Sequence, residues 1–193
     1  IFELNVNDLS IPIGSKNSIN LRTLNLKVLG PSIFFEGVMK ADNRKMSGSI
    51  KNFSYDIFNN NKVEDLTIFL DDFNSEMLFP DLKAFSVEGP VKFNILPVKK
   101  DDNSIIKWNI DLNQANVYIP VLTLKKIKGN YGQLKLNFNE DNSVDFKYTQ
   151  NDVLVSGSAS LKSAFEIKKI DYSIINTPDI QIKRATFQKF GKY

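Results

Sequence analysis

The clearest pattern in the chain is an alternation of apolar and polar residues with a period of two. Successive side chains of a β-strand point to opposite faces, so this alternation predicts strands with one apolar and one polar face. Sheets with two such different faces are typically antiparallel. We therefore expect an all-β protein. The alternating segments are 91–95, 106–112, 134–138, 144–148 and 153–159.

Short turn-forming sequences separate these segments. Gly89-Pro90, Gly129-Asn130 and Asn151-Asp152 are examples, and their spacing is typical of consecutive hairpins. Helical periodicity is scarce, with one short candidate at 71–78 that Pro80 would end. The predicted fold is a long twisted antiparallel sheet that forms an elongated, half-open groove. The alternative is a β-sandwich, in which two apolar faces pack together.

Two pairs of similar segments suggest an internal repeat. Leu4-Asn5 precedes Ile11-Pro12 by the same spacing that separates Leu112-Asn113 from Ile119-Pro120, at an offset of 108 residues. The motif around Gly48 recurs around Gly157 at an offset of 109 residues. We expect one segment, 1–193, with internal repeats at 1–58 and 109–193. The alternative is chance recurrence in a strand-rich chain.

Composition removes most catalytic chemistry. The chain of 193 residues is 42% hydrophobic and 24% charged, as in ordinary folded proteins, but it contains no Cys and no His. Disulfides, Ser-His-Asp and Cys-His catalysis and ordinary zinc sites are therefore excluded. No phosphate-binding glycine motif occurs, and the carboxylate pairs Asp71-Asp72 and Asp101-Asp102 are typical of turns. We predict a protein that is not an enzyme and needs no cofactor or metal.

Charge and hydropathy give further expectations about partners. The net charge is only +3, the two signs are interleaved, and the three arginines are Arg22, Arg44 and Arg184. Nucleic acid is therefore not an expected partner. No run of 18 apolar residues occurs that could span a bilayer. Because the chain opens at Ile1, we expect a domain or mature piece whose membrane anchor lies outside it.

Many strands with one apolar face need something to cover that face, because large exposed apolar surfaces normally bind a partner. A lipid acyl chain of about 16 carbons would gain on the order of 10 kcal/mol on leaving water, and would need no polar motif. For any single residue, ordinary core packing is an equally good interpretation. The candidate lipid-binding residues are Trp108, Ile110, Leu112, Leu134, Leu136, Phe138, Phe146 and Tyr148.

The segment 108–129 also carries a recognisable pattern. A Trp-x-x-Asp-Leu-x-x-Ala strand precedes an apolar-Pro step, then a Lys and a Gly, and the element Val155-Ser-Gly-Ser-Ala159 follows. Together with the closing segments 165–174 and 180–185, it resembles AsmA-like envelope proteins of the YhdP and TamB type. The resemblance covers roughly residues 104–190, with a fainter copy in 1–58.

This resemblance implies a periplasmic protein of Gram-negative bacteria that is anchored to the inner membrane. Its repeating β-grooves would move phospholipid between the inner and outer membranes, with phospholipid acyl chains as partners and no catalytic residues. The alternative function is a cell-surface adhesion or scaffold module, a β-sandwich that binds protein through loops or an edge strand. A polysaccharide-processing enzyme would need a convergent carboxylate pair, of which the sequence shows no sign. The oligomeric state is left open.

Overall fold

The computed structural model describes eleven stretches of the chain, which contain fifteen β-strands and one short 3-10 turn, η1 (Pro120–Leu122). The described residues are 1–13, 17–30, 32–40, 45–51, 66–75, 85–100, 103–139, 141–163, 166–178, 181–182 and 185–188. The strands are β1 (Phe2–Ile13), β2 (Asn17–Leu29), β3 (Ser32–Met39), β4 (Lys45–Lys51), β5 (Leu66–Asn74), β6 (Ser86–Lys100), β7 (Asn103–Asp111), β8 (Asn116–Ile119), β9 (Leu124–Lys126), β10 (Gln133–Phe138), β11 (Ser143–Gln150), β12 (Val153–Ser163), β13 (Glu166–Asn176), β14 (Gln181–Ile182) and β15 (Ala185–Gln188).

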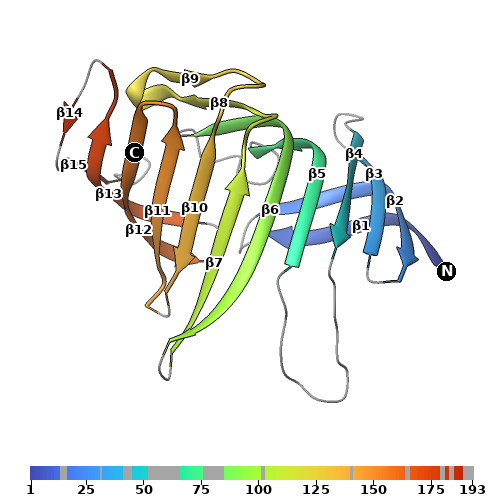
Figure 1. The fold of residues 1–193 in the computed structure, drawn as a ribbon. Coiled ribbons are helices and arrows are strands. Elements are labelled where there is room, and N and C mark those ends of the chain that lie inside the picture. The colour runs from blue at the N-terminus through green and yellow to red at the C-terminus, as the bar shows by residue number, and fades with distance from the viewer. Residues whose placement is uncertain are drawn as a thin grey trace.

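All fifteen strands belong to one antiparallel sheet whose order follows the chain (Figure 1). The path runs from β1 to β7, passes directly to β10, and continues to β14, while β15 also pairs with β13. The sheet does not close, because its path begins at β1 and ends at β14. The predicted all-β antiparallel fold is confirmed. The β-sandwich alternative is wrong for the described strands, since they form one sheet and not two.

The register of the sheet places apolar residues beside apolar residues on every strand. Cross-strand partners point to the same face, so each paired row shows what that face carries. One row consists of Leu66, Ile95, Trp108, Leu136, Phe146, Gly157 and Tyr172. The row one residue further along β10 consists of Lys107, Asn137, Asp145, Ser158 and Asp171. The sheet therefore has one apolar face, which contains the first row, and one polar face, which contains the second.

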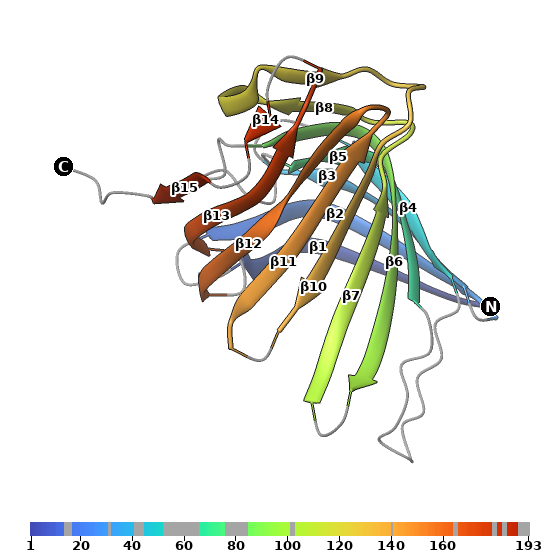
Figure 2. The same ribbon diagram turned by 60° about the vertical axis from the view of Figure 1, so that its left-hand side comes forward.

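The sheet is strongly twisted, as is usual for long antiparallel strands. In both views β1 and β2 run crosswise to β10, β11 and β12 (Figures 1 and 2). β-Bulges shift the register at positions where apolar and polar residues do not alternate strictly. In β13, Ser173 is an extra residue between Tyr172 and Ile174, and it brings both Tyr172 and Ile175 onto the apolar face. Both of these side chains are buried.

A bulge also explains why the expected helix at 71–78 is wrong over its first residues. Asp71 and Asp72 lie in β5, where the register shifts between Leu70 and Phe73. Both aspartates are exposed, and Asp71 Oδ2 accepts a hydrogen bond from Ser47 Oγ on β4 at 3.0 Å. These two aspartates therefore lie at a β-bulge in β5 and do not cap a helix. Residues 76–78 lie outside the described part of the chain.

The two glycines of the suggested repeat occupy similar positions on the apolar face. Gly48 pairs with Phe35, and Gly157 pairs with Phe146. A side chain at Gly48 would collide with the Phe35 ring and the Phe69 carbonyl. The two Ile-Pro steps differ, because Pro12 lies within β1 whereas Pro120 begins η1. The repeat itself stays a prediction.

Gly157 gives a direct test of this close packing. A Cβ at this position would meet the carbonyl oxygen of Asp171 and lie 2.9 Å from the Cα of Tyr172. We expect Gly157→Ala to lower the free energy of unfolding by about 1–3 kcal/mol, because β12 and β13 must move apart. Urea unfolding followed by the fluorescence of Trp108, the single tryptophan, measures this change.

The matched control is Ser158→Ala on the adjacent, polar position of β12, which should change stability by less than about 0.5 kcal/mol. Equal stability of the Gly157→Ala variant and the wild type would contradict the close approach of β12 to β13 at this position.

Candidate functional site

A short hairpin folds over one end of the apolar face. This flap, Asn116–Lys126, consists of β8, η1 and β9, and β8 also pairs with the first residues of β6. Figure 2 shows the flap across the upper end of the sheet. The buried cluster between the flap and the sheet contains Val117 and Ile119 of the flap together with Val87, Val91, Ile110, Leu112, Ala115, Tyr148, Val153, Val155, Tyr172 and Ile175. The apolar face is therefore covered at this end by the chain itself.

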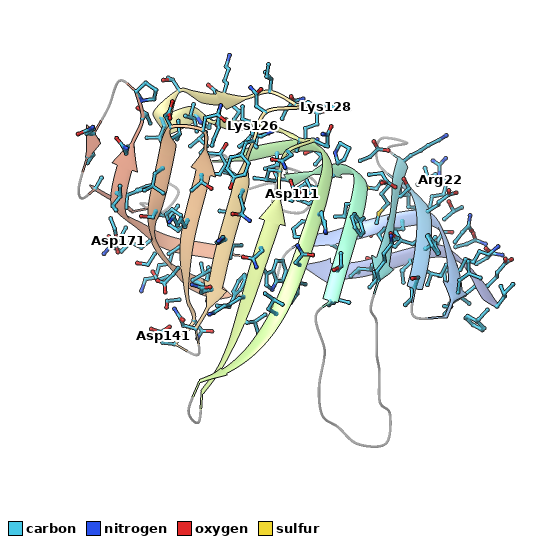
Figure 3. All side chains as sticks on the ribbon, in the orientation of Figure 1. Arg22, Asp111, Lys126, Lys128, Asp141 and Asp171 are labelled. Atoms are coloured by element: carbon cyan, nitrogen blue, oxygen red, sulfur yellow. The ribbon has the colours of Figure 1, made fainter. Side chains whose placement is uncertain are left out.

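A buried lysine holds the base of the flap. The side chain of Lys126 is 1% exposed, and its Nζ donates hydrogen bonds to Ala115 O at 2.8 Å and to Asn113 O and Ile127 O at 3.3 Å. Gly132 makes room for it, because a Cβ there would collide with the Lys126 stem. Figure 3 shows Lys126 at the flap end of the sheet, near Asp111. Burial lowers the pKa of Lys126, and the charge of Asp111 partly opposes that effect.

The loop that follows the flap is fastened by two asparagine side chains. Asn113 Oδ1 accepts a hydrogen bond from Gly132 N, and Asn116 Oδ1 accepts one from Lys128 N, both at 2.9 Å. Gly129 N donates to Asn113 O at 2.8 Å, with Gly129 in the left-handed region at a φ of 91°. These bonds hold the residues of the loop in one conformation.

A second set of contacts ties the flap to β11. The hydroxyl of Tyr148 donates to Gln150 Oε1 at 2.7 Å, and Gln150 Nε2 donates to Lys125 O at 3.3 Å. Burial raises the pKa of the Tyr148 hydroxyl, so it stays a neutral donor. The flap is therefore attached both to the turn after β7, through Lys126, and to β11.

Beyond the flap, a row of aromatic rings lines the apolar face. Phe73 contacts Phe93 edge to face at 5.7 Å between ring centroids, and Phe93 contacts Trp108 in the same way at 6.0 Å. Trp108 in turn contacts Phe138 at 5.3 Å. The ring of Trp108 is half-buried, and Ile106, two residues earlier on β7, is 45% exposed. This part of the face is accessible to solvent.

The eight predicted lipid-binding residues fall into two groups. Ile110, Leu112 and Tyr148 are buried beneath the flap and are at most 6% exposed. The other five residues are half-buried on the same face, namely Trp108, Leu134, Leu136, Phe138 and Phe146. Seven of the eight lie on the neighbouring strands β7, β10 and β11, and Leu112 follows directly after β7, but only the second group is partly open to solvent.

Sequence reasoning missed the flap itself. Val117 and Ile119 are buried and face the core from above, and Leu122 and Leu124 pack against it. Lys126 stands in a Lys-Lys-Ile-Lys sequence that is typical of a solvated surface. The one signal that could have revealed its burial is Gly132, six residues later, which leaves space for a long side chain.

The described residues were also compared with two other kinds of site, a metal site and a membrane-spanning helix. They contain no group of three or more acidic residues arranged to hold a metal ion. No helix among them is long and apolar enough to cross a membrane. No protein-family model matches the chain, and searches of curated proteins and of solved structures found no match either.

The hydrogen bonds of Lys126 predict the effect of its removal. In Lys126→Met, Asn113 O keeps the Gly129 amide and Ile127 O keeps the Asn130 amide, but the buried Ala115 O loses the donor that Lys126 provided. We expect a loss of about 1–3 kcal/mol in the free energy of unfolding, measured by urea denaturation. Lys125→Met, on the exposed side of β9, is the control and should stay close to the wild type.

The lowered pKa of Lys126 predicts a pH dependence. Between that lowered pKa and the ordinary value of 10.5, the unfolded chain binds more protons at this residue than the folded chain does. The stability of the wild type relative to Lys126→Met should therefore increase as pH rises toward 10.5. The buried tyrosines contribute equally to both proteins and cancel. A stability difference that stays constant over this range would show that Lys126 keeps its ordinary pKa.

Proposed function

We propose that the apolar face binds lipid acyl chains and that the chain is a lipid-binding segment of a lipid-transfer protein. The observation that supports this most directly is the continuous apolar row from β5 to β13, over which the described residues place no second sheet. Outside the flap, the aromatic residues of this face are half-buried and Ile106 is exposed. A sheet of this kind gains stability when an apolar ligand completes its packing.

The chemistry of this face suits an acyl chain better than a polar ligand. The exposed part presents Trp108, Leu136, Phe138 and Phe146, and none of these offers a charged group to a ligand. Each methylene removed from water contributes about 0.8 kcal/mol, so the gain grows with the length of chain that is covered. The flap closes one end, so an acyl chain would lie over β7, β10 and β11 beyond the flap.

The cellular setting that we propose is the periplasm of a Gram-negative bacterium, with phospholipid moved between the two membranes. This part of the proposal is based on the resemblance of segment 108–129 to AsmA-like envelope proteins. In the structure, this segment is the end of β7 together with the flap and its following loop. Residues of this pattern take part in hydrogen bonds at the base of the flap: Asp111 Oδ1 accepts from Asn113 N at 2.8 Å, Ala115 O accepts from Lys126 Nζ, and Gly129 N donates to Asn113 O.

A protein-binding module is the second candidate, and β1 is the feature that favours it. This strand has 12 residues and lies at an edge of the sheet, where its only described partner strand is β2. Such an edge can add a strand from another protein. Absence of apolar-dye binding, together with a compact scattering profile, would favour this function over lipid binding.

Ile106 and Ile174 provide a matched pair for testing lipid binding. They are 45% and 42% exposed, on the apolar face and the polar face respectively. We expect Ile106→Asp to reduce copurifying lipid strongly, because a charge next to the acyl chain would have to lose its hydration. Native mass spectrometry and lipid extraction of the purified protein measure the bound lipid.

Ile174→Asp places the same charge on the other face and should leave the lipid content unchanged. Both variants should remain folded, since both positions are exposed, and circular dichroism checks this. Wild-type protein without any copurifying lipid, or equal lipid in the two variants, would contradict the proposed function.

A further inference from the structure

The outer side of the flap and the loop that follows it carry an exposed surface of their own, which the proposed lipid-binding face does not include. This tip consists of Tyr118, Lys125, Ile127, Lys128 and Tyr131. Ile127 is 66% exposed, Tyr131 is 50% exposed and Tyr118 is 39% exposed, and both lysines are exposed as well. Exposed isoleucine and tyrosine side chains next to lysines are typical of surfaces that contact a membrane.

The charged side chains of the tip itself are two lysines, Lys125 and Lys128. Residues 112–134 contain one further lysine, the buried Lys126, and no aspartate or glutamate. Among the described residues, nearby acidic side chains include Glu88, which pairs with Asn116, the half-buried Asp111, and Asp152 in the turn after β11. By contrast, Asp141 lies at the opposite end of the sheet from Lys126 and Lys128 (Figure 3). The tip is therefore a basic end, which complements an anionic surface.

The tip is also held in place before any partner arrives. Lys128 N is bonded to Asn116 Oδ1, Gly129 N to Asn113 O, and Gly132 N to Asn113 Oδ1. The ammonium group of Lys125 lies 5.5 Å from the centre of the Tyr118 ring, on the outer side of the flap. A surface that is already ordered loses little conformational freedom on binding.

We propose that the tip docks onto an anionic lipid bilayer, with Ile127 and Tyr131 entering the interface and Lys125 and Lys128 facing the headgroups. The apolar side chains supply the contact with the acyl boundary, and the lysines supply attraction to negative headgroups. This docking is separate from acyl-chain binding on the sheet. It places the flap, which covers one end of the apolar face, directly against the membrane.

The test is flotation of the whole chain with vesicles. Vesicles of phosphatidylcholine with about 30% phosphatidylglycerol should bind the protein at an ionic strength of about 0.1 M, and binding should weaken at about 0.5 M salt. Pure phosphatidylcholine vesicles should bind it far less. Absence of binding to the anionic vesicles overturns the proposal, even if the tip binds an acidic protein.

Two pairs of variants distinguish binding through the tip from nonspecific electrostatic attraction of the whole protein to the vesicles. Lys125→Gln with Lys128→Gln should weaken partitioning on the order of 30-fold, whereas Lys135→Gln with Lys147→Gln removes the same charge from the polar face and should have an effect below about 3-fold. Ile127→Ser should weaken partitioning, and Ile174→Ser should not. Equal effects within either pair overturn the assignment to the tip.

Failure of this proposal and failure of the lipid-binding face give different results. Ile106→Asp should lose copurifying lipid but should still float with anionic vesicles, because Ile106 lies on β7 away from the tip. The double lysine variant should float less but retain its copurifying lipid. Thermal unfolding of each variant confirms that the fold is intact.

Discussion

The structure depends on one constraint, the register that keeps apolar residues beside apolar residues from strand to strand. Trp108 pairs with Ile95 on one side and with Leu136 on the other, and the row continues through Phe146. A shift of one residue at any of these pairings would move a set of apolar side chains to the polar face. The bulges at Asp71 and Ser173 preserve this segregation where the sequence does not alternate strictly.

One consequence is that a sheet of a single layer has few other residues with which to cover its apolar face. The flap covers only one end, and its position depends on a charged residue inside the fold. The ammonium group of Lys126 replaces its lost hydration with three carbonyl oxygens, and Gly132 leaves the volume that its stem occupies. Through these hydrogen bonds Lys126 both fixes the geometry of the flap and adds to the stability of the fold.

The strands with regular alternation could be predicted from the sequence, and the flap could not. The segments 106–112, 134–138 and 144–148 give the period directly, and their turns contain Gly, Asn and Asp. The flap depends on a contact between Lys126 and carbonyls of residues 113 and 115, which no local pattern encodes. For the same reason the alternation pattern predicted the same lipid-binding role for Leu112, Tyr148 and Trp108. In the structure the flap buries Leu112 and Tyr148 and leaves Trp108 half-buried.

The order of the strands has a further consequence for how the protein folds. Except where β7 pairs with β10, each main strand of the sheet from β1 to β14 pairs with the strand before it in the chain. Contacts between neighbours in the sequence close short loops and form quickly. Each hairpin can therefore form as soon as its two strands are free to pair, so the sheet can grow strand by strand in the order of the chain. The flap is completed later, because Gln150 of β11, whose amide donates to Lys125 O, follows the flap in the chain.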